Sequence, residues 1–187
     1  MYFKKKDLVI LGILFLLFVS FHNAPAIQEK KVFPKPEKIK NLLFYVQRTT
    51  NTNTLIYELN VDEKEQVNME EPIKIYWKNY AGNNNTESLN YIQRKYAYGL
   101  EVKLMDAKKK SFCFNFVSYK KKQLYLIKSA LDNKYDVFIQ INNKPIILNS
   151  VFIQIEGGTY WFPKIKYVEV KGKDIYNNEE VVERIIP

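Results

Sequence analysis

Short runs of β-branched and aromatic residues, separated by turn-forming residues, recur along this chain from residue 41 onward. Such residues favour β-strands because their side chains pack well on a pleated surface. Strands that follow one another after short turns are typical of antiparallel all-β folds. We therefore expect residues 41–187 to form a single mainly β domain, an antiparallel sandwich or barrel. The expected strands are residues 42–48, 54–59, 73–80, 100–105, 112–119, 124–128, 135–141, 146–156, 165–171 and 181–186.

One segment has the spacing of a helix instead. Leu89, Ile92 and Tyr96 fall on one face of a helical turn. Capping residues flank this segment, with Asn85 or Thr86 at its start and Gly99 at its end. We predict one helix of about three turns, near residues 87–98, that packs across a sheet or plugs the mouth of a barrel.

Residues 1–26 contain the three parts of a secretory signal peptide. Three lysines precede an apolar stretch, residues 8–21, that is shorter than the roughly 20 residues needed to cross a bilayer. The sequence Ala-Pro-Ala then ends at Ala26, where we expect signal peptidase to cut. An uncleaved N-terminal anchor is the alternative. We expect the charged residues 27–40 to form an extended tether and the cleaved protein to have no membrane span.

The scarcity of histidine and cysteine limits the chemistry of this protein. The one histidine, His22, lies in the predicted signal, and Cys113 is the one cysteine. The mature chain therefore cannot build a Ser-His-Asp or Cys-His site, or a zinc site with histidine ligands. Because Cys113 alternates with aromatic residues, we expect it to be a small buried side chain. We predict no catalytic residues, no metal and no cofactor.

Arginine is rare in this basic chain, because only three of its 29 basic residues are arginines. Arg48 and Arg94 each follow a glutamine, Gln47 and Gln93 respectively. The planar guanidinium group suits two-pronged contacts with carboxylates and phosphates. A structural ion pair or a contact with a backbone carbonyl is the favoured interpretation. The alternative is a ligand site in which these four residues hold an anion.

The formal net charge of +9 suits an anionic or amphipathic ligand of the cell envelope, although a solvated lysine-rich surface gives the same balance. Two lysine triplets, residues 108–110 and 120–122, flank one expected strand. At about 3.3 Å per residue they would lie about 30 to 40 Å apart, at opposite ends of that strand. We therefore expect solvated turns rather than a lipid or nucleic-acid patch. The expected protein is a monomer without a nucleic-acid partner.

Residues 151–163, VFIQIEGGTYWFP, place two glycines between two strand-like runs. Gly157 and Gly158 fit the tight turn of a β-hairpin, in which both central residues have positive φ. The alternative is a loop that lines a ligand site, with Glu156, Tyr160 and Trp161 as binding residues. We favour the structural turn because no helix follows that could present backbone amides to a phosphate.

The same stretch also carries a family resemblance. The runs LLFYVQR, PIKIYW, YIQRKYAYGL, FNFVSYKK and FIQIEGGTYWFPKIKYVEV resemble a bacterial family of secreted proteins, domain of unknown function 4833. These runs cover most of residues 41–187, and EGGTYWFP is the most specific of them. The resemblance implies a bacterial exported protein, either periplasmic or extracellular. It carries no activity, substrate or catalytic residue over to this chain.

Three functions from different classes fit these observations. The favoured one is a non-catalytic binding or accessory module of the envelope, in which some of the 14 Tyr and 12 Phe side chains line a cavity for lipid, glycan or peptide. The first alternative is a structural or protein-interaction domain whose aromatic residues only fill a core. The second is a glycan hydrolase that uses Glu156 with Glu101 or Glu169, which requires two carboxyl groups about 5 to 10 Å apart.

Overall fold

The computed structural model describes residues 32–80, 84–129, 133–159 and 162–187. All of them belong to one compact unit that spans Lys31–Pro187. The predicted signal, residues 1–26, and its cleavage point after Ala26 lie outside the described residues. Within the described ranges, no helix is long and apolar enough to cross a membrane.

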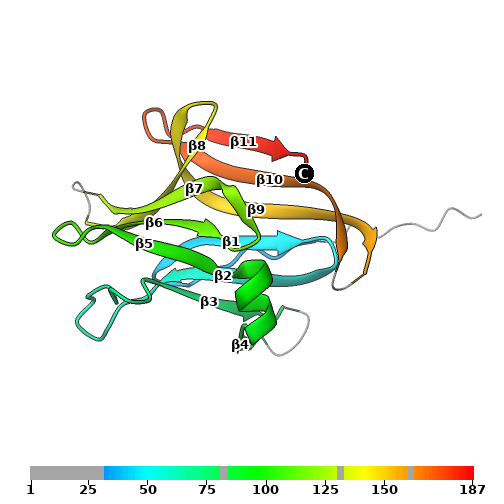
Figure 1. Cartoon of the computed structure of the whole chain (residues 1–187), viewed down its shortest axis with the longest axis horizontal. Helices are drawn as coiled ribbons and strands as arrows, with labels where there is room; N and C mark the ends of the chain where they lie inside the picture. The colour runs from blue at the N-terminus through cyan, green and yellow to red at the C-terminus, as the bar shows by residue number, and fades with distance from the viewer. Residues whose placement is uncertain (1–31, 81–83, 130–132, 160–161) are drawn as a thin grey trace, which may run out of the picture. The chain divides into compact units, whose positions relative to one another are not determined.

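The described part of the chain forms eleven strands and one short helix, and all eleven strands join one sheet (Figure 1). The strands are β1 (Leu42–Arg48), β2 (Asn51–Leu59), β3 (Ile73–Lys78), β4 (Thr86–Ser88), β5 (Leu100–Asp106), β6 (Ser111–Phe116), β7 (Tyr119–Lys128), β8 (Tyr135–Ile141), β9 (Lys144–Gly158), β10 (Pro163–Asp174) and β11 (Glu180–Ile185). The helix η1 (Gln93–Tyr98) lies between β4 and β5 in the chain. The mainly β class predicted from the residue pattern is confirmed.

Strand β9 is the branch point of the sheet. Its first residues, Lys144–Ile147, pair with β8, whereas Ser150–Ile153 pair with β1 on the same edge. The opposite edge of β9 pairs with β10 along most of its length, and β11 pairs with the other edge of β10. Two arms therefore diverge from β9, one formed by β1 to β4 and the other by β5 to β8. The β1–β9 pairing is parallel, which differs from the all-antiparallel expectation.

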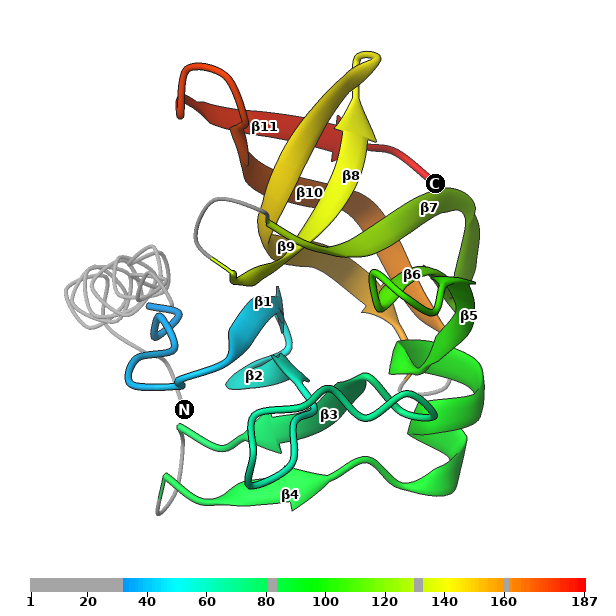
Figure 2. The same cartoon turned by 90° about the vertical axis from the view of Figure 1, so that its left-hand side faces the viewer.

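The sheet curls until its two arms face each other, which gives a half-barrel rather than a flat sandwich or a closed barrel. Figure 2 shows this curl, with β1 to β4 below and β5 to β8 arching above them. In the described residues no strand pairing joins β4 to β5, so the curl stays open along that side. The helix lies at this opening (Figures 1 and 2).

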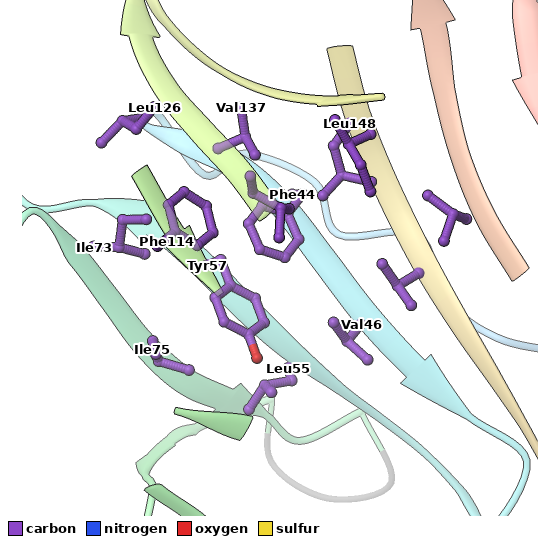
Figure 3. Packing of buried hydrophobic residues seen from close by; sticks show 14 of the residues in the cluster. Phe44, Val46, Leu55, Tyr57, Ile73, Ile75, Phe114, Leu126, Val137 and Leu148 are labelled. Atoms are coloured by element: carbon purple, nitrogen blue, oxygen red, sulfur yellow. The ribbon is translucent and has the colours of Figure 1, made fainter. Parts of the chain in front are cut away.

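Aromatic rings fill the space between the arms. The ring of Phe44 on β1 stacks on the ring of Tyr57 on β2, with centroids 4.3 Å apart. Phe116 on β6 meets both rings edge-on, with centroids 6.1 and 5.7 Å away. Phe114 on β6, Leu126 on β7 and Val137 on β8 complete this packing (Figure 3). Burial of each such side chain contributes roughly 1.5 to 3 kcal/mol, so this cluster holds the arms together.

The helix begins later than expected, with one short helical stretch at residues 91–92 that leads into η1, and Thr86–Ser88 form the short strand β4 instead. Asn90 caps its start, because the Asn90 Oδ1 accepts the Gln93 N–H at 2.9 Å and the Gln93 Oε1 accepts the Asn90 N–H at 3.2 Å. Of the expected apolar face, only Leu89 is buried, while Ile92 and Tyr96 are exposed. The predicted capping by Asn85 or Thr86 is therefore wrong. The helix is held by its ends and not by an apolar face.

Cys113 is half-buried, so the expectation of a fully buried thiol is wrong. Side chains alternate between the two faces of a strand. In β6, Phe112 and Phe114 take the core face, where each is only 1% exposed. Cys113 consequently lies on the outer face, beside Lys103 of β5 and Tyr125 of β7.

Residues 32–40, within the expected tether, lack regular secondary structure but pack against the sheet. Phe33 meets Phe152 of β9 edge-on with centroids 5.1 Å apart, and Pro36 is buried. The Gln47 side chain donates a hydrogen bond to the Pro34 carbonyl at 2.7 Å. From residue 32 onward, this segment therefore belongs to the domain.

Candidate functional site

A cavity of about 240 Å³ lies inside the curl, where the arms diverge from β9 and β10. Its walls are mainly aliphatic, and β9 and β10 contribute half a dozen of the lining side chains: Leu148, Val151, Ile153, Ile165, Val168 and Val170. Residues of β1, β2, β6, β7, β8 and β11 complete the walls. The volume lies just below the roughly 300 to 1,000 Å³ of ordinary small-molecule sites.

A β-bulge in β9 keeps its side chains directed at this cavity. Lys171 of β10 pairs with Ser150, but the next residue, Gly172, pairs with Leu148, so Asn149 is an extra residue in β9. Both Leu148 and Val151 therefore face inward, although strict alternation would turn one of them outward. A Cβ atom at Gly172 would lie 2.3 Å from the Ile147 carbonyl oxygen. The bulge thus requires glycine at this position.

Polar groups gather at the rim of the cavity. Lys122 of β7 lines it and forms an ion pair with Glu183 of β11, with 2.6 Å between Nζ and Oε2. Both side chains are about three-quarters buried. This pair is therefore less solvated than the ion pair between Lys120, also on β7, and Glu101 of β5. Ser118 also lines the cavity and donates a hydrogen bond to the Ala97 carbonyl at 2.6 Å. The cavity is therefore apolar inside and polar at its edge.

The end of the helix forms one wall, through Ala97 and Tyr98. The Tyr57 hydroxyl donates a hydrogen bond to the Tyr98 carbonyl at 2.8 Å. Burial raises the pKa of Tyr57 well above its ordinary value, and the neighbouring Tyr98 adds to the rise, so this hydroxyl stays protonated as a donor. The Tyr98 ring meets Trp77 edge-on at 5.3 Å. These contacts fix the helix end over the cavity.

Arg48 and Gln93, two of the predicted ligand residues, both contact Trp77. The Arg48 guanidinium lies 4.7 Å from the Trp77 ring centroid and donates a hydrogen bond to the Tyr98 hydroxyl. The Gln93 Oε1 accepts the Trp77 indole N–H at 3.2 Å. Within the described residues, no carboxylate forms an ion pair with Arg48. This cluster lies against the helix and ties η1 to β1 and β3.

The other glutamine and arginine make separate contacts. The buried Gln47 donates hydrogen bonds to the Pro34 carbonyl and to the Thr54 Oγ1, the latter at 3.0 Å. Arg94 forms a half-exposed ion pair with Glu71 at 2.9 Å. The Arg94 contact is an ion pair of the kind that the sequence analysis favoured for an arginine.

The glycine pair lies at the end of β9, and the loop that follows it is longer than a two-residue turn. Gly157 and Gly158 have φ values of +82° and +83°, the positive angles that the tight-turn hypothesis required. However, Gly158 still pairs with Pro163, and the Thr159 N–H donates to the Phe162 carbonyl at 3.1 Å. The expected two-residue turn is therefore wrong in length. Tyr160 and Trp161 lie outside the described residues.

The acidic residues considered for glycan hydrolysis are each engaged by a basic side chain. Glu156 pairs with Lys166 at 2.8 Å, and Glu101 pairs with Lys120 at 2.5 Å. Glu169 lies opposite Phe152, four residues along β9 from Glu156. At about 3.3 Å per residue this places the two acids about 13 Å apart along the strands, beyond the spacing of a glycosidase pair.

Glu169 on the outer face of β10 has a shifted pKa. Burial alone would raise its pKa, but hydrogen bonds and positive charge from Arg184 and Lys171 outweigh this effect. The pKa of Glu169 therefore lies below its ordinary value, and the carboxylate stays ionised. The described residues contain no cluster of three His, Cys, Asp or Glu side chains that could hold a metal ion.

Sequence reasoning missed the residues that form the cavity. The expected cavity lining was aromatic, and Tyr57, Tyr98, Phe116 and Tyr119 do line the cavity, but the aliphatic side chains of β9 and β10 that dominate its walls were not expected there. The contribution of β7 and β11 at the rim was also missed, because Lys122 and Glu183 are far apart in the chain. A usable signal was present in the residue types, since aromatic residues dominate β6 while Val, Leu and Ile dominate the inward positions of β9 and β10.

Comparison with known proteins places this architecture in a family. A family described as domain of unknown function (DUF4833) matches residues 44–184, which include almost the whole sheet. The chain belongs to this family. The resemblance inferred from the sequence runs is thus confirmed. Neither a curated protein nor a solved structure matches the chain.

Proposed function

We propose that this member of the DUF4833 family is an exported binding module of the bacterial envelope, which takes the aliphatic chain of a lipid or another amphiphile into the cavity. The observation that carries the proposal is the mainly aliphatic cavity between the arms, with Lys122, Glu183 and Ser118 at its polar rim. A preformed apolar cavity gains free energy when an apolar chain fills it, because such a space is poorly hydrated.

The division into apolar walls and a polar rim favours an amphipathic ligand over a glycan. Sugar hydroxyls need hydrogen-bond partners when they are buried. The inner walls supply mostly methyl and methylene groups, whereas the rim offers a hydroxyl and an ion pair. An alkyl chain inside and a polar head group at the rim would satisfy both parts of the site.

Export is the second part of the proposal, and residues 1–26 support it through their basic start, apolar stretch and Ala-Pro-Ala end. Edman sequencing of the protein recovered outside the cytoplasm should begin at Ile27. Recovery of Met1 on a membrane-bound product would contradict cleavage after Ala26. This result is independent of what the cavity binds.

Calorimetric titration of the purified domain with dodecanoate tests the binding proposal. Val168 on β10 lines the cavity, whereas Val181 on β11 is also half-buried but does not line it. We therefore expect the larger ring in Val168→Phe to narrow the cavity and weaken binding at least tenfold, about 1.4 kcal/mol. Val181→Phe, the matched control, should bind like the wild type.

Circular dichroism and urea unfolding should first establish that both variants are folded. Failure of the wild type to bind dodecanoate saturably would favour the alternative, a structural or protein-interaction domain of the envelope. Equal affinity of folded Val168→Phe and wild type would place the ligand elsewhere. A negative heat-capacity change is expected for the productive interaction, because apolar surface is buried.

A further inference from the structure

A second hollow, of about 280 Å³, lies on the surface at the other end of the curled sheet from the helix. Lys108, Lys109 and Lys110 of the β5–β6 turn line it, together with Lys128 at the end of β7. The remaining lining residues are Glu65, Gln66, Val67 and Tyr135. Figure 1 shows the β2–β3 loop and the β5–β6 turn at the same end of the sheet. Four lysines thus contribute to the lining of one small concave surface.

These four lysines differ from Lys120 and Lys122 of the second triplet. Lys120 and Lys122 of β7 form ion pairs with Glu101 and Glu183. By contrast, no carboxylate in the described ranges forms an ion pair with any of the four lysines of the hollow. The lysine triplets look alike in the sequence, but only the second one has members that neighbouring carboxylates neutralise.

The acidic residues near the hollow are already engaged. Glu65, which lines it, forms an ion pair with Lys40. Asp106 at the end of β5 accepts the backbone N–H groups of Lys108 and Lys109 at 2.8 and 3.1 Å, and thereby shapes the turn. Because the lining contains four lysines and one glutamate, the hollow has an excess of positive charge, and a concave surface concentrates the resulting potential.

The chemistry of the lining selects the kind of anion. Lysine is a compact point charge with three rotatable donors, which suits the several oxygens of a phosphate group. The Lys128 ammonium lies over the Tyr135 ring, 5.9 Å from the ring centroid, and this cation–π contact holds the Lys128 side chain beside Tyr135. Burial raises the pKa of Tyr135, so its hydroxyl stays protonated and can donate to an anion.

We propose that this lysine hollow, lined by Lys108, Lys109, Lys110 and Lys128, binds a phosphate group. Free phosphates and the head group of an anionic phospholipid carry the same chemistry. This site is not apparent from the sequence, because Lys128 is far from the first lysine triplet along the chain. Only the pairing of β6 with β7 brings Lys128 close to residues 108–110. The proposal does not depend on what the inner cavity binds.

Calorimetric titration of the protein with inorganic pyrophosphate at low salt tests the site. Lys109→Gln/Lys110→Gln should weaken pyrophosphate binding at least tenfold. Lys120→Gln/Lys121→Gln removes the same charge from the second triplet and should change the affinity less than twofold. Equal weakening by both double variants would reduce the effect to net charge and overturn the proposal. Unchanged affinity in both variants, or no saturable binding by the wild type, would also overturn it.

A vesicle arm distinguishes the two sources of phosphate. Phosphatidylglycerol vesicles should sediment the wild type, and pyrophosphate should displace it, if a lipid head group occupies the hollow. Absence of sedimentation, with pyrophosphate binding retained, supports the site and assigns it to a free phosphate. Vesicle binding that survives Lys109→Gln/Lys110→Gln and resists pyrophosphate would contradict a lipid head group in this hollow.

Discussion

Two regions inside the same curled sheet are built from the same strand periodicity and yet differ in packing. Between the arms, Phe44, Phe112 and Phe114 occupy inward positions, and these rings are at most 1% exposed and do not line the cavity. Beside β9 and β10, the inward positions carry shorter side chains such as Val151 and Val168, and a cavity of about 240 Å³ remains. The difference shows that alternation determines which side chains face inward, while their volume determines whether the space closes.

The largest expected contrast comes from two leucines that are both 0% exposed. Leu126 lies in the packed region, whereas Leu148 borders the cavity. Leu→Ala costs roughly 2 to 5 kcal/mol, and the cost is larger where neighbouring atoms enclose the leucine on every side. We expect Leu126→Ala to fall near the upper end of this range and Leu148→Ala near the lower end. Urea unfolding of both variants measures the difference, and equal destabilisation would contradict a preformed cavity.

A smaller contrast is expected at two glycines of the β9–β10 region. At Gly172, on the bulge, a Cβ atom would meet the Ile147 carbonyl oxygen at 2.3 Å, and backbone cannot yield cheaply. Gly172→Ala should therefore lower the free energy of unfolding by about 1 to 3 kcal/mol. At Gly157 there is open space, so Gly157→Ala should cost only the strain of positive φ, about 1 kcal/mol.

Chemical denaturation of the two alanine variants decides between these effects. Gly172→Ala should also alter dodecanoate binding, because the bulge directs Leu148 and Val151 into the cavity, whereas Gly157→Ala should not. A Gly172→Ala protein with wild-type stability and wild-type affinity would show that the bulge does not shape the cavity. The comparison thus separates local strain from a change in the site.

The smallest effect is expected outside both regions, at Glu169 on the outer face of β10. Its pKa is lowered in the folded protein, so its stabilising contribution is present above its unfolded pKa, about 4.3, and is lost as pH falls through the lower folded pKa. As the pH falls between these two pKa values, the free energy of unfolding should decrease less for Glu169→Gln than for the wild type. The difference between the two proteins should be less than about 1 kcal/mol. Melting temperatures measured between pH 5 and pH 3 provide the check, and parallel curves for the two proteins would contradict it.

Local patterns in the sequence located most of the strands, because alternation and residue type are local properties. The hairpin between β8 and β9 follows from Asn142 and Asn143, which both adopt the positive φ of a tight turn. The parallel pairing of Arg48 with Ile153 joins segments that lie far apart in the chain, so no local pattern contains it. Register between distant strands depends on tertiary packing.

The candidate site was less accessible to sequence reasoning, for a related physical reason. Arg48 was singled out because arginine is rare here, and it does make a specialised contact, on the faces of Trp77 and Tyr98. The cavity itself results from the bulge at Asn149 and from the summed volumes of side chains on eight strands. Neither the extra residue nor the missing volume is visible in any single segment.

Methyl-resolved NMR during a dodecanoate titration tests the account most directly. If the aliphatic cavity receives the alkyl chain, the methyl signals of Leu148, Val151 and Ile153 should shift and saturate together. Those of Leu126 and Val137, which lie in the packed region, should stay nearly unchanged. Shifts confined to exposed side chains such as Ile186, or equal shifts in both regions, would contradict the claim that the cavity is the binding site.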